Sequence, residues 1–427
     1  MVERLPVPAP LARPLGYPRV ANLPEERQEG LRRFWLEGLF SSIGLALTDP
    51  YYTLYALSLG ANSSQIGLVN TLSQLSGAIL SLPGAILAER SGRYKWVALT
   101  GQFLKQSMWL LMGLAVWLLP PSAALGMVLA GWVAVSIFGT LLGSAWSSLV
   151  AEIVPAAIRG QYFASRNILM QLSKIAIVPA AGLFIKTIGE PLGYQAVFIL
   201  GFIFGLGALY FFRGLPEHRH TPVASSGERF GLRETLRGMR AYHNYRHFVL
   251  AHTVLNFGVM LGGPFIQVYM VEAAHFDVAT ISVLNTVGVF ATMISMYVFG
   301  RWQDRFGITW IMRFTVAMPI IPVLWLGVTE PWQGALVQFY ASVAWTGYNL
   351  GSFNLLLAIT PENHRPRYLA LHTTIAALIG SIGPMIGGWL LDATGFLPVF
   401  SLSTIFRAAG MILFLALVRE PAQAESA

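Results

Sequence analysis

The sequence predicts an all-α membrane protein with 12 transmembrane helices, arranged as two six-helix bundles that repeat one another. Three observations predict this fold: the composition, the succession of apolar runs, and the matching loops of the two halves. Hydrophobic residues make up 55% of the 427 residues and charged residues only 11%, against about 25% charged in ordinary soluble proteins. So few charges cannot cover a soluble protein of this length, and the same composition excludes a disordered chain.

Twelve apolar runs have the length that a membrane-spanning helix needs. A bilayer core about 30 Å thick requires about 20 apolar residues per helix. The predicted spans are 34–59, 65–88, 96–119, 123–150, 163–188 and 194–212 in the first half, and 248–271, 278–300, 308–328, 333–359, 368–391 and 396–418 in the second. The runs are too long, and alternate too little, for the strands of a membrane β-barrel.

The predicted domains follow from the placement of these spans. They are a cytoplasmic tail (1–33), a first bundle (34–213), a cytoplasmic linker loop (214–247), a second bundle (248–420) and a short tail (421–427). The first tail contains six prolines and no apolar run, so we expect it to be mostly disordered and not a signal peptide. In the linker, the arginines of Gly231–Tyr242 suit either an amphipathic helix on the inner leaflet or a solvated basic loop.

The basic residues predict the orientation of the chain. With the N-terminus inside, 24 of the 28 Lys and Arg residues fall on the cytoplasmic side and only Lys186 falls on the other, while Lys105, Lys174 and Arg407 lie within spans. Such a bias predicts that both termini are cytoplasmic. We expect an integral protein of a bacterial-type inner membrane, in contact with lipid and not with nucleic acid, because the positive charge lies in short loops between spans.

The two halves repeat one another at their cytoplasmic loops. Asp49-Pro50 in the first span is echoed by Gly263-Pro264 in the seventh, and Arg159 and Arg365 lie 206 residues apart in matching loops. The remaining matched loop residues are Glu89, Arg90, Gly92 and Arg93 after span two, and Gly300, Asp304, Arg305 and Gly307 after span eight. Only glycine permits a tight turn at Gly92 and Gly307. An acidic residue beside arginines suits either a gating latch that breaks and reforms or a plain ion pair that holds the loop.

With these loops the chain resembles the major facilitator superfamily. The run from Gly300 through Asp304 and Arg305 to Gly307 matches the loop signature of that family, whereas the first copy has Ala85 at the glycine position and Glu89 for the aspartate. The resemblance covers the chain beyond residue 33 and implies a secondary transporter whose halves alternate access to a central site. Signatures of the family's drug–proton antiporters are absent or displaced, because span four lacks an arginine and the Gly-Pro-x-x-Gly-Gly run of 383–388 lies in span eleven.

Asp49 is the leading candidate for a functional residue, because an ionisable group inside a membrane is costly and is a functional hypothesis by default. Ser42, Asp49 and Thr53 share one face of the first span, so Asp49 either carries a proton or binds solute, or it caps the turn before Pro50. The resemblance places the helix of Lys174 beside that of Asp49 and thereby implies an Asp49–Lys174 pair.

Polar and aromatic residues in spans seven and ten are candidates for the solute site. His252, Asn256 and Gln267 lie on one face of span seven, and Trp345 and Asn349 on one face of span ten. The resemblance implies that these helices line the cavity; interhelical hydrogen bonds are the alternative explanation. Other polar residues received other interpretations: snorkelling or interhelical pairing for Lys105 and Arg407, and a gate or interface for Glu37, Arg166 and His372.

The sequence therefore predicts a secondary transporter of a small solute, with coupling to protons left open. It predicts no enzyme, cofactor or metal site, since the chain has no Cys and no phosphate-binding loop. The alternatives are a proton-independent facilitator, and a receptor or assembly factor that uses the same scaffold without transporting anything.

Overall fold

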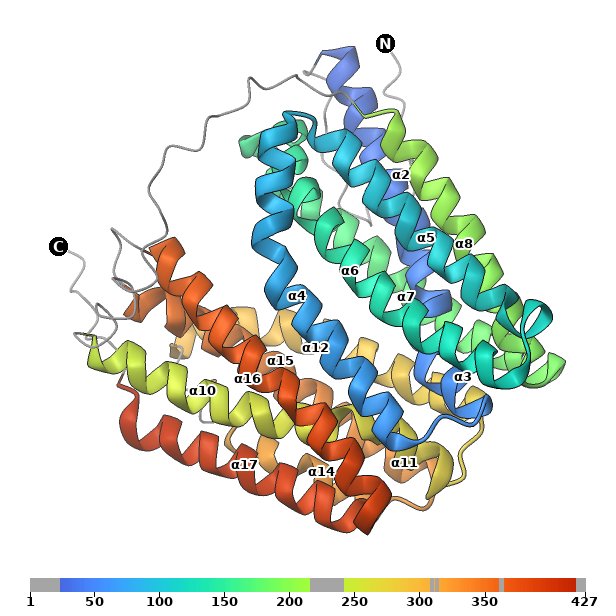
Figure 1. The fold of residues 1–427 in the computed structure, drawn as a ribbon. Coiled ribbons are helices and arrows are strands. Elements are labelled where there is room, and N and C mark those ends of the chain that lie inside the picture. Colours follow the sequence, from blue (N-terminus) through green and yellow to red (C-terminus); the bar gives the residue numbers. More distant parts are fainter. Residues whose placement is uncertain (1–23, 216–241, 308–310, 312–314, 361–364, 420–427) are drawn as a thin grey trace. The chain divides into compact units, whose positions relative to one another are not determined.

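The protein is described by a computed structural model that covers residues 24–215, 242–307, 311, 315–360 and 365–419. These residues are helical and contain no strand (Figure 1). Contacts divide the chain into an N-terminal unit, residues 1–61 and 79–226, and a C-terminal unit, residues 62–78 and 227–427.

In the N-terminal unit, α2 packs on α7 and α8, and α5 packs on α6 and α8 (Figure 1). Its elements are α2 (Glu25–Thr48), α3 (Tyr52–Ser58), the second half of α4 (Ser63–Ser91), α5 (Tyr94–Leu118), α6 (Pro121–Ile153), η1 (Ala156–Ile158), α7 (Arg159–Ile188) and α8 (Leu192–Arg213).

The C-terminal unit repeats this packing, because α10 packs on α16 and α17 as α2 packs on α7 and α8, and α12 packs on α15. Its elements are the first half of α4, then α10 (His243–Gly262), η2 (Gly263–Phe265), α11 (Ile266–Glu272), α12 (Val278–Phe306), η3 (Thr315–Ile320), α14 (Ile321–Leu326), α15 (Pro331–Ile359), α16 (Arg365–Thr394) and α17 (Phe396–Leu417).

These helices account for the predicted spans. Seven helices among the described residues are long and apolar enough, by length and composition, to cross a membrane. The other predicted spans correspond to α2 with α3, α4, α5, η3 with α14, and α15. Span nine is described only in part, because residues 308–310 and 312–314 lie outside the described residues.

The first and seventh spans are each interrupted at a proline, whereas the sequence predicts each as one continuous span. The first span ends as α2 at Thr48 and resumes as α3 at Tyr52, and the seventh passes from α10 through the 3-10 turn η2 to α11. The cause is the same in both, because Pro50 and Pro264 have no N–H to donate to the preceding turn. Gly92 and Gly307 also adopt the left-handed conformation expected of them, with φ of 58° and 81°.

The first helix is longer than the sequence predicted. It begins at Glu25, so the last part of the expected disordered tail is helical. Glu25 and Glu26 lie in its first turn, where acidic groups favour the positive end of the helix dipole. Leu31 is completely buried and accepts a 2.7 Å hydrogen bond at its carbonyl from the Tyr162 hydroxyl of α7.

The first half of α4 is held to α16 in the C-terminal unit. The Asp392 carboxylate accepts hydrogen bonds from the backbone N–H groups of Ser63 (3.1 Å) and Ser64 (2.9 Å), and the Thr71 hydroxyl donates to the Ser381 carbonyl at 2.7 Å. Asp392 thus caps α4 from another helix. This role cannot be predicted from the sequence, because the cap and the capped residues are far apart in the chain.

Candidate functional site

A buried ion pair joins α2 to α7 in the N-terminal unit. Arg166 Nη2 lies 2.7 Å from Glu37 Oε2, with side chains that are 6% and 9% exposed. The guanidinium also stacks over the rings of Phe34 (4.5 Å) and Trp146 (5.6 Å). Gly38 makes room for it, since a Cβ there would collide with Arg166 Nε. Sequence reasoning gave both residues only a gate or interface role and did not pair them.

A cavity of about 260 Å³ adjoins this pair. Lys105 of α5 lines it together with Glu37 and Arg166, and the snorkelling or interhelical pairing expected of Lys105 stays a prediction. The remaining lining residues include Ser41, Gln102, Trp146 and Met170. Two cationic groups and one carboxylate therefore surround this small space, beside an aromatic wall.

Asp49 lies at the C-terminal end of α2, where its side chain is exposed. Lys105 and Lys174 both attract its carboxylate electrostatically. Within the described part of the chain, however, neither lysine forms an ion pair with Asp49 within 4.0 Å, so the implied Asp49–Lys174 contact is not made. Asp49 thus has attracting neighbours without being fixed by a direct bond.

The predicted polar stripe of the first span does not share one environment. Ser42 is completely buried and donates a 2.9 Å hydrogen bond to the Met170 carbonyl of α7. Thr53 is also buried, on α3 beyond the break, whereas Asp49 is exposed. The prediction assumed one continuous helix, and the break at Pro50 changes which residues share a face.

In the C-terminal unit, side chains from three helices form a row of rings. Tyr348 of α15 and His252 Nδ1 of α10 are hydrogen bonded at 2.8 Å, and the His252 ring lies 4.6 Å from that of His372 on α16. Trp345, which is 37% exposed, stacks 6.0 Å from Tyr348 at the other end. We call Trp345, Tyr348, His252 and His372 the aromatic row. It contains no charged carboxylate or ammonium group.

The other predicted residues of spans seven and ten fall into different environments. Asn256 donates a 3.1 Å hydrogen bond to the Ala376 carbonyl of α16, as the interhelical alternative requires. Asn349 is exposed and donates to Trp345 in its own helix (3.0 Å). Gln267 is half-buried on α11, so the turn η2 separates it from His252, and the predicted continuous face of span seven is not formed.

The predicted gating loops are only partly visible. The side chains of Glu89, Arg90, Asp304 and Arg365 lie outside the described residues. Arg159 donates to the Val154 carbonyl at 3.2 Å, and Arg305 lies 5.2 Å from the Phe306 ring. Of the remaining loop residues, Gly300 has no side chain, and Arg93 is exposed and forms no ion pair with the residues that the structure describes. The latch therefore stays a prediction.

Among the described residues, no cluster of three or more His, Asp and Glu side chains suits a metal ion. His243 and His247 stand four residues apart, a spacing that can bind a metal ion, and His247 contacts the Leu417 carbonyl through Nδ1 at 3.2 Å. The other pair with that kind of spacing, His218 and His220, lies outside the described residues.

Comparison with known proteins finds similar chains along nearly the whole length. The sequence profile of the Major Facilitator Superfamily matches residues 34–266 and 248–427. Two curated relatives are 23% identical and align over 87% of this chain and 92% of their own length: the quinolone resistance protein NorA of Staphylococcus aureus and the multi-drug resistance efflux pump PmrA of Streptococcus pneumoniae.

Solved structures share the fold at lower identity. A bacterial homologue of the iron transporter ferroportin in an inward-facing state aligns with a TM-score of 0.73 at 14% identity, over 91% of this chain and 98% of that one. The nucleoside transporter NupG aligns with a TM-score of 0.63 at 14% identity, over 92% and 98%. At this identity the likeness concerns the fold alone.

Proposed function

The chain belongs to the major facilitator superfamily, and from this premise we propose that it exports a ring-bearing organic solute in exchange for protons. Membership makes it an integral membrane secondary transporter of a small solute. The proposal concerns the class of solute, the direction and the coupling ion. It includes no enzymatic step, and it places the protein in a bacterial-type inner membrane with both termini cytoplasmic, as the distribution of Lys and Arg favours.

The position of Asp49, exposed at the end of α2 and attracted by two lysines, is the observation on which the proton coupling rests. Glu37 cannot be protonated without disrupting its 2.7 Å bond to a buried arginine, which would leave an uncompensated charge. Asp49 has no such bond among the described residues, yet two lysines attract it. Protonation of Asp49 would release Lys105 and Lys174 from that attraction without breaking an ion pair, as a carrier of one proton per cycle requires.

The aromatic row supports an organic solute with rings. Trp345 presents an exposed indole, and Tyr348 and His252 extend the stack behind it. Flat faces of this kind hold aromatic groups by offset stacking. The names of the two relatives, which refer to quinolone resistance and multi-drug efflux, support the same class of solute and an outward direction.

Transport measured in proteoliposomes tests the proposal. Purified protein is reconstituted, a pH gradient is imposed, and flux is followed across a panel of neutral and cationic aromatic compounds, sugars and nucleosides. We expect gradient-dependent flux of the aromatic compounds only. A facilitator would instead move its solute equally with and without the gradient, and a receptor would move none.

Asp49→Asn is the informative variant. We expect it to abolish gradient-driven flux while the protein remains inserted, because an amide cannot take up the proton. The matched control is Asp277→Asn, which changes an acid to an amide at the N-cap of α12, where asparagine serves as well. If Asp49→Asn responds to the gradient like the parent and like Asp277→Asn, Asp49 does not carry the proton.

A further inference from the structure

A second, larger cavity lies where α2 begins and α8 ends in the N-terminal unit. Its volume is about 380 Å³, and it is lined by Glu29, Arg32, Arg33, Leu36, Tyr210, Phe211, Arg213 and Gly214. We call it the arginine pocket. It is separate from the cavity at Glu37 and Arg166, because the two share no lining residue.

The arginine pocket has more positive groups than its one acidic residue can neutralise. Glu29 Oε1 lies 2.9 Å from Arg33 Nε, and Glu29 Oε2 lies 3.5 Å from Arg32 Nη1. Arg213 is exposed and forms no ion pair within the described part of the chain. Arg32 Nε is buried and has no hydrogen-bond partner among the same residues. Three guanidinium groups against one carboxylate leave a surplus of N–H donors facing a preformed space.

Part of this arrangement is fixed before any ligand arrives. Arg33 Nη1 donates a 2.9 Å hydrogen bond to the Gly214 carbonyl, which ties α2 to the end of α8. Glu29 holds Arg33 from the preceding turn. Because these hydrogen bonds already fix Arg33 and Glu29, a ligand would not have to immobilise them, which lowers the entropic cost of binding.

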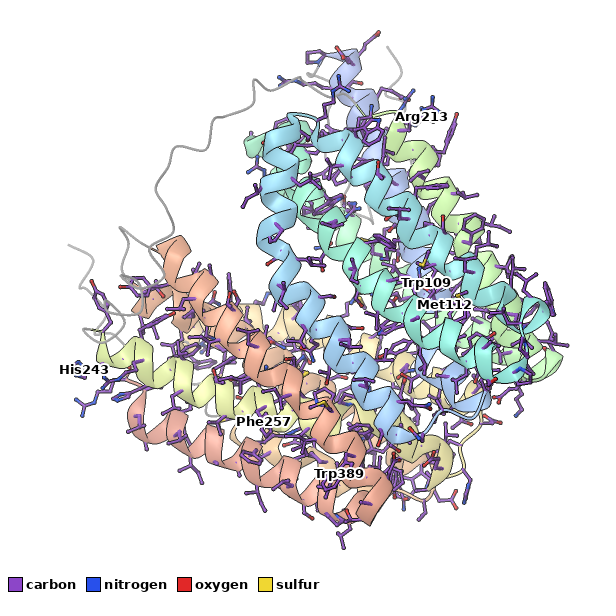
Figure 2. The ribbon with its side chains drawn as sticks, in the orientation of Figure 1. Trp109, Met112, Arg213, His243, Phe257 and Trp389 are labelled. Atoms are coloured by element: carbon purple, nitrogen blue, oxygen red, sulfur yellow. The ribbon has the colours of Figure 1, made fainter. Side chains whose placement is uncertain are left out.

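The pocket lies at the end of a candidate membrane span. α8 is a candidate span that ends at Arg213, and Figure 2 shows Arg213 at that end of the helix. Tyr210, one turn earlier, is 75% exposed, and tyrosine at a helix end is typical of the headgroup region. Leu36 and Phe211 supply apolar lining beside the arginines.

We propose that the arginine pocket binds the phosphate of an anionic membrane phospholipid. Guanidinium groups match phosphate oxygens with paired hydrogen bonds, and basic pockets between helices on the cytoplasmic side suit lipid headgroups. The apolar lining and Tyr210 favour a lipid over a free phosphate ion, because only a lipid has apolar groups that can contact them. This site is independent of the solute and of proton coupling.

The matching junction of the C-terminal unit is closed by direct bonds instead. At the start of α10, Asn244 Nδ2 donates to the Arg419 carbonyl (2.6 Å), and the Arg419 N–H donates to Asn244 Oδ1 (2.8 Å). There the chain itself satisfies the groups at the junction. The repeat thus provides an internal contrast to the arginine pocket.

Lipid titration of the purified full-length protein, followed by native mass spectrometry, tests the site. The probes are phosphatidylglycerol and, as the zwitterionic reference, phosphatidylcholine. The variants are Arg32→Gln/Arg213→Gln and, as the matched control, Arg93→Gln, an exposed arginine outside the pocket. At about 1 kcal/mol for each arginine near the surface, the double variant should bind its first phosphatidylglycerol about 30-fold more weakly, with phosphatidylcholine unchanged.

A single variant and a competition with inorganic phosphate complete the test. Arg213→Gln alone changes only an exposed side chain, so it should fold normally and weaken phosphatidylglycerol about fivefold. Inorganic phosphate is titrated as a competitor, and we expect it not to displace the lipid at millimolar concentration. Losses no larger than that of Arg93→Gln would overturn the proposal in favour of general surface attraction. Displacement of the lipid by phosphate would overturn it in favour of a free-anion site.

Discussion

The two units build the same helix contact with opposite chemistry. Phe34 and Phe248 are 214 residues apart, as are Pro50 and Pro264, and Arg166 and His372 are separated by the same 206 residues as Tyr162 and Tyr368. In the N-terminal unit Arg166 stacks 4.5 Å over Phe34; in the C-terminal unit His372 lies 5.5 Å from Phe248. The repeat has therefore kept the position of the ring contact while changing its partner from a cation to an imidazole.

The change of partner determines which further side chains complete the contact in each unit. A neighbouring acid stabilises a buried arginine, and Glu37 supplies one for Arg166. An imidazole requires none, so the C-terminal unit completes the contact with His252 and Tyr348. Two bundles with the same helix packing can therefore hold different sites. The charged site suits a proton, and the uncharged aromatic site suits an organic solute.

The largest expected effect comes from breaking the charged contact. Glu37→Gln leaves the buried Arg166 charge without its partner, so we expect the free energy of unfolding to fall by about 3–5 kcal/mol. Chemical or thermal unfolding of the protein in detergent measures this.

The double variant Glu37→Leu/Arg166→Leu is the control for the charged contact. It should recover much of the loss, because it removes both charges together. The comparison is sharpened by His372→Phe, which exchanges one ring for another in the uncharged contact and should cost far less. Equal losses for Glu37→Gln and His372→Phe would contradict the contrast between the units.

A smaller effect is expected from Gly38→Ala, which tests the space that the arginine occupies. The new methyl group would collide with Arg166 Nε and lie 2.8 Å from its Cζ, and overpacking of this kind costs about 1–3 kcal/mol. Gly126→Ala on α6 is the matched control, because a methyl group there has no atom within 4 Å. If both variants unfold alike, the guanidinium is not fixed against α2.

Much of the fold could be predicted from the sequence. Apolar runs of bilayer length predict the helices, and Gly92 and Gly307 predict the left-handed turns, whereas the interruptions at Pro50 and Pro264 were not predicted. These features are local, since each depends on a residue and its neighbours in the chain. The early start of α2 could not be predicted, because the spans were recognised as runs of apolar residues and the first residues of α2 are polar or charged.

The candidate site could be predicted less well, because its contacts join distant residues. Glu37 and Arg166 are 129 positions apart and Tyr348 and His252 are 96 apart, and no pattern within either helix specifies the pairing. One signal was available: His372 stands where the repeat places Arg166 in the first half. Asn256 and Gln267 were placed together because a continuous helix was assumed across the turn at Pro264.

We propose that the charged N-terminal unit carries the proton and that the aromatic row binds the solute. Counterflow exchange of the solute, without a pH gradient, tests it most directly in proteoliposomes that contain Asp49→Asn or Trp345→Ala. We expect Asp49→Asn to exchange solute like the parent, whereas Trp345→Ala should require about two- to thirteenfold more solute for half-maximal exchange, since one ring stack is worth about 0.5–1.5 kcal/mol. Loss of exchange in Asp49→Asn, or parental exchange in Trp345→Ala, would contradict it.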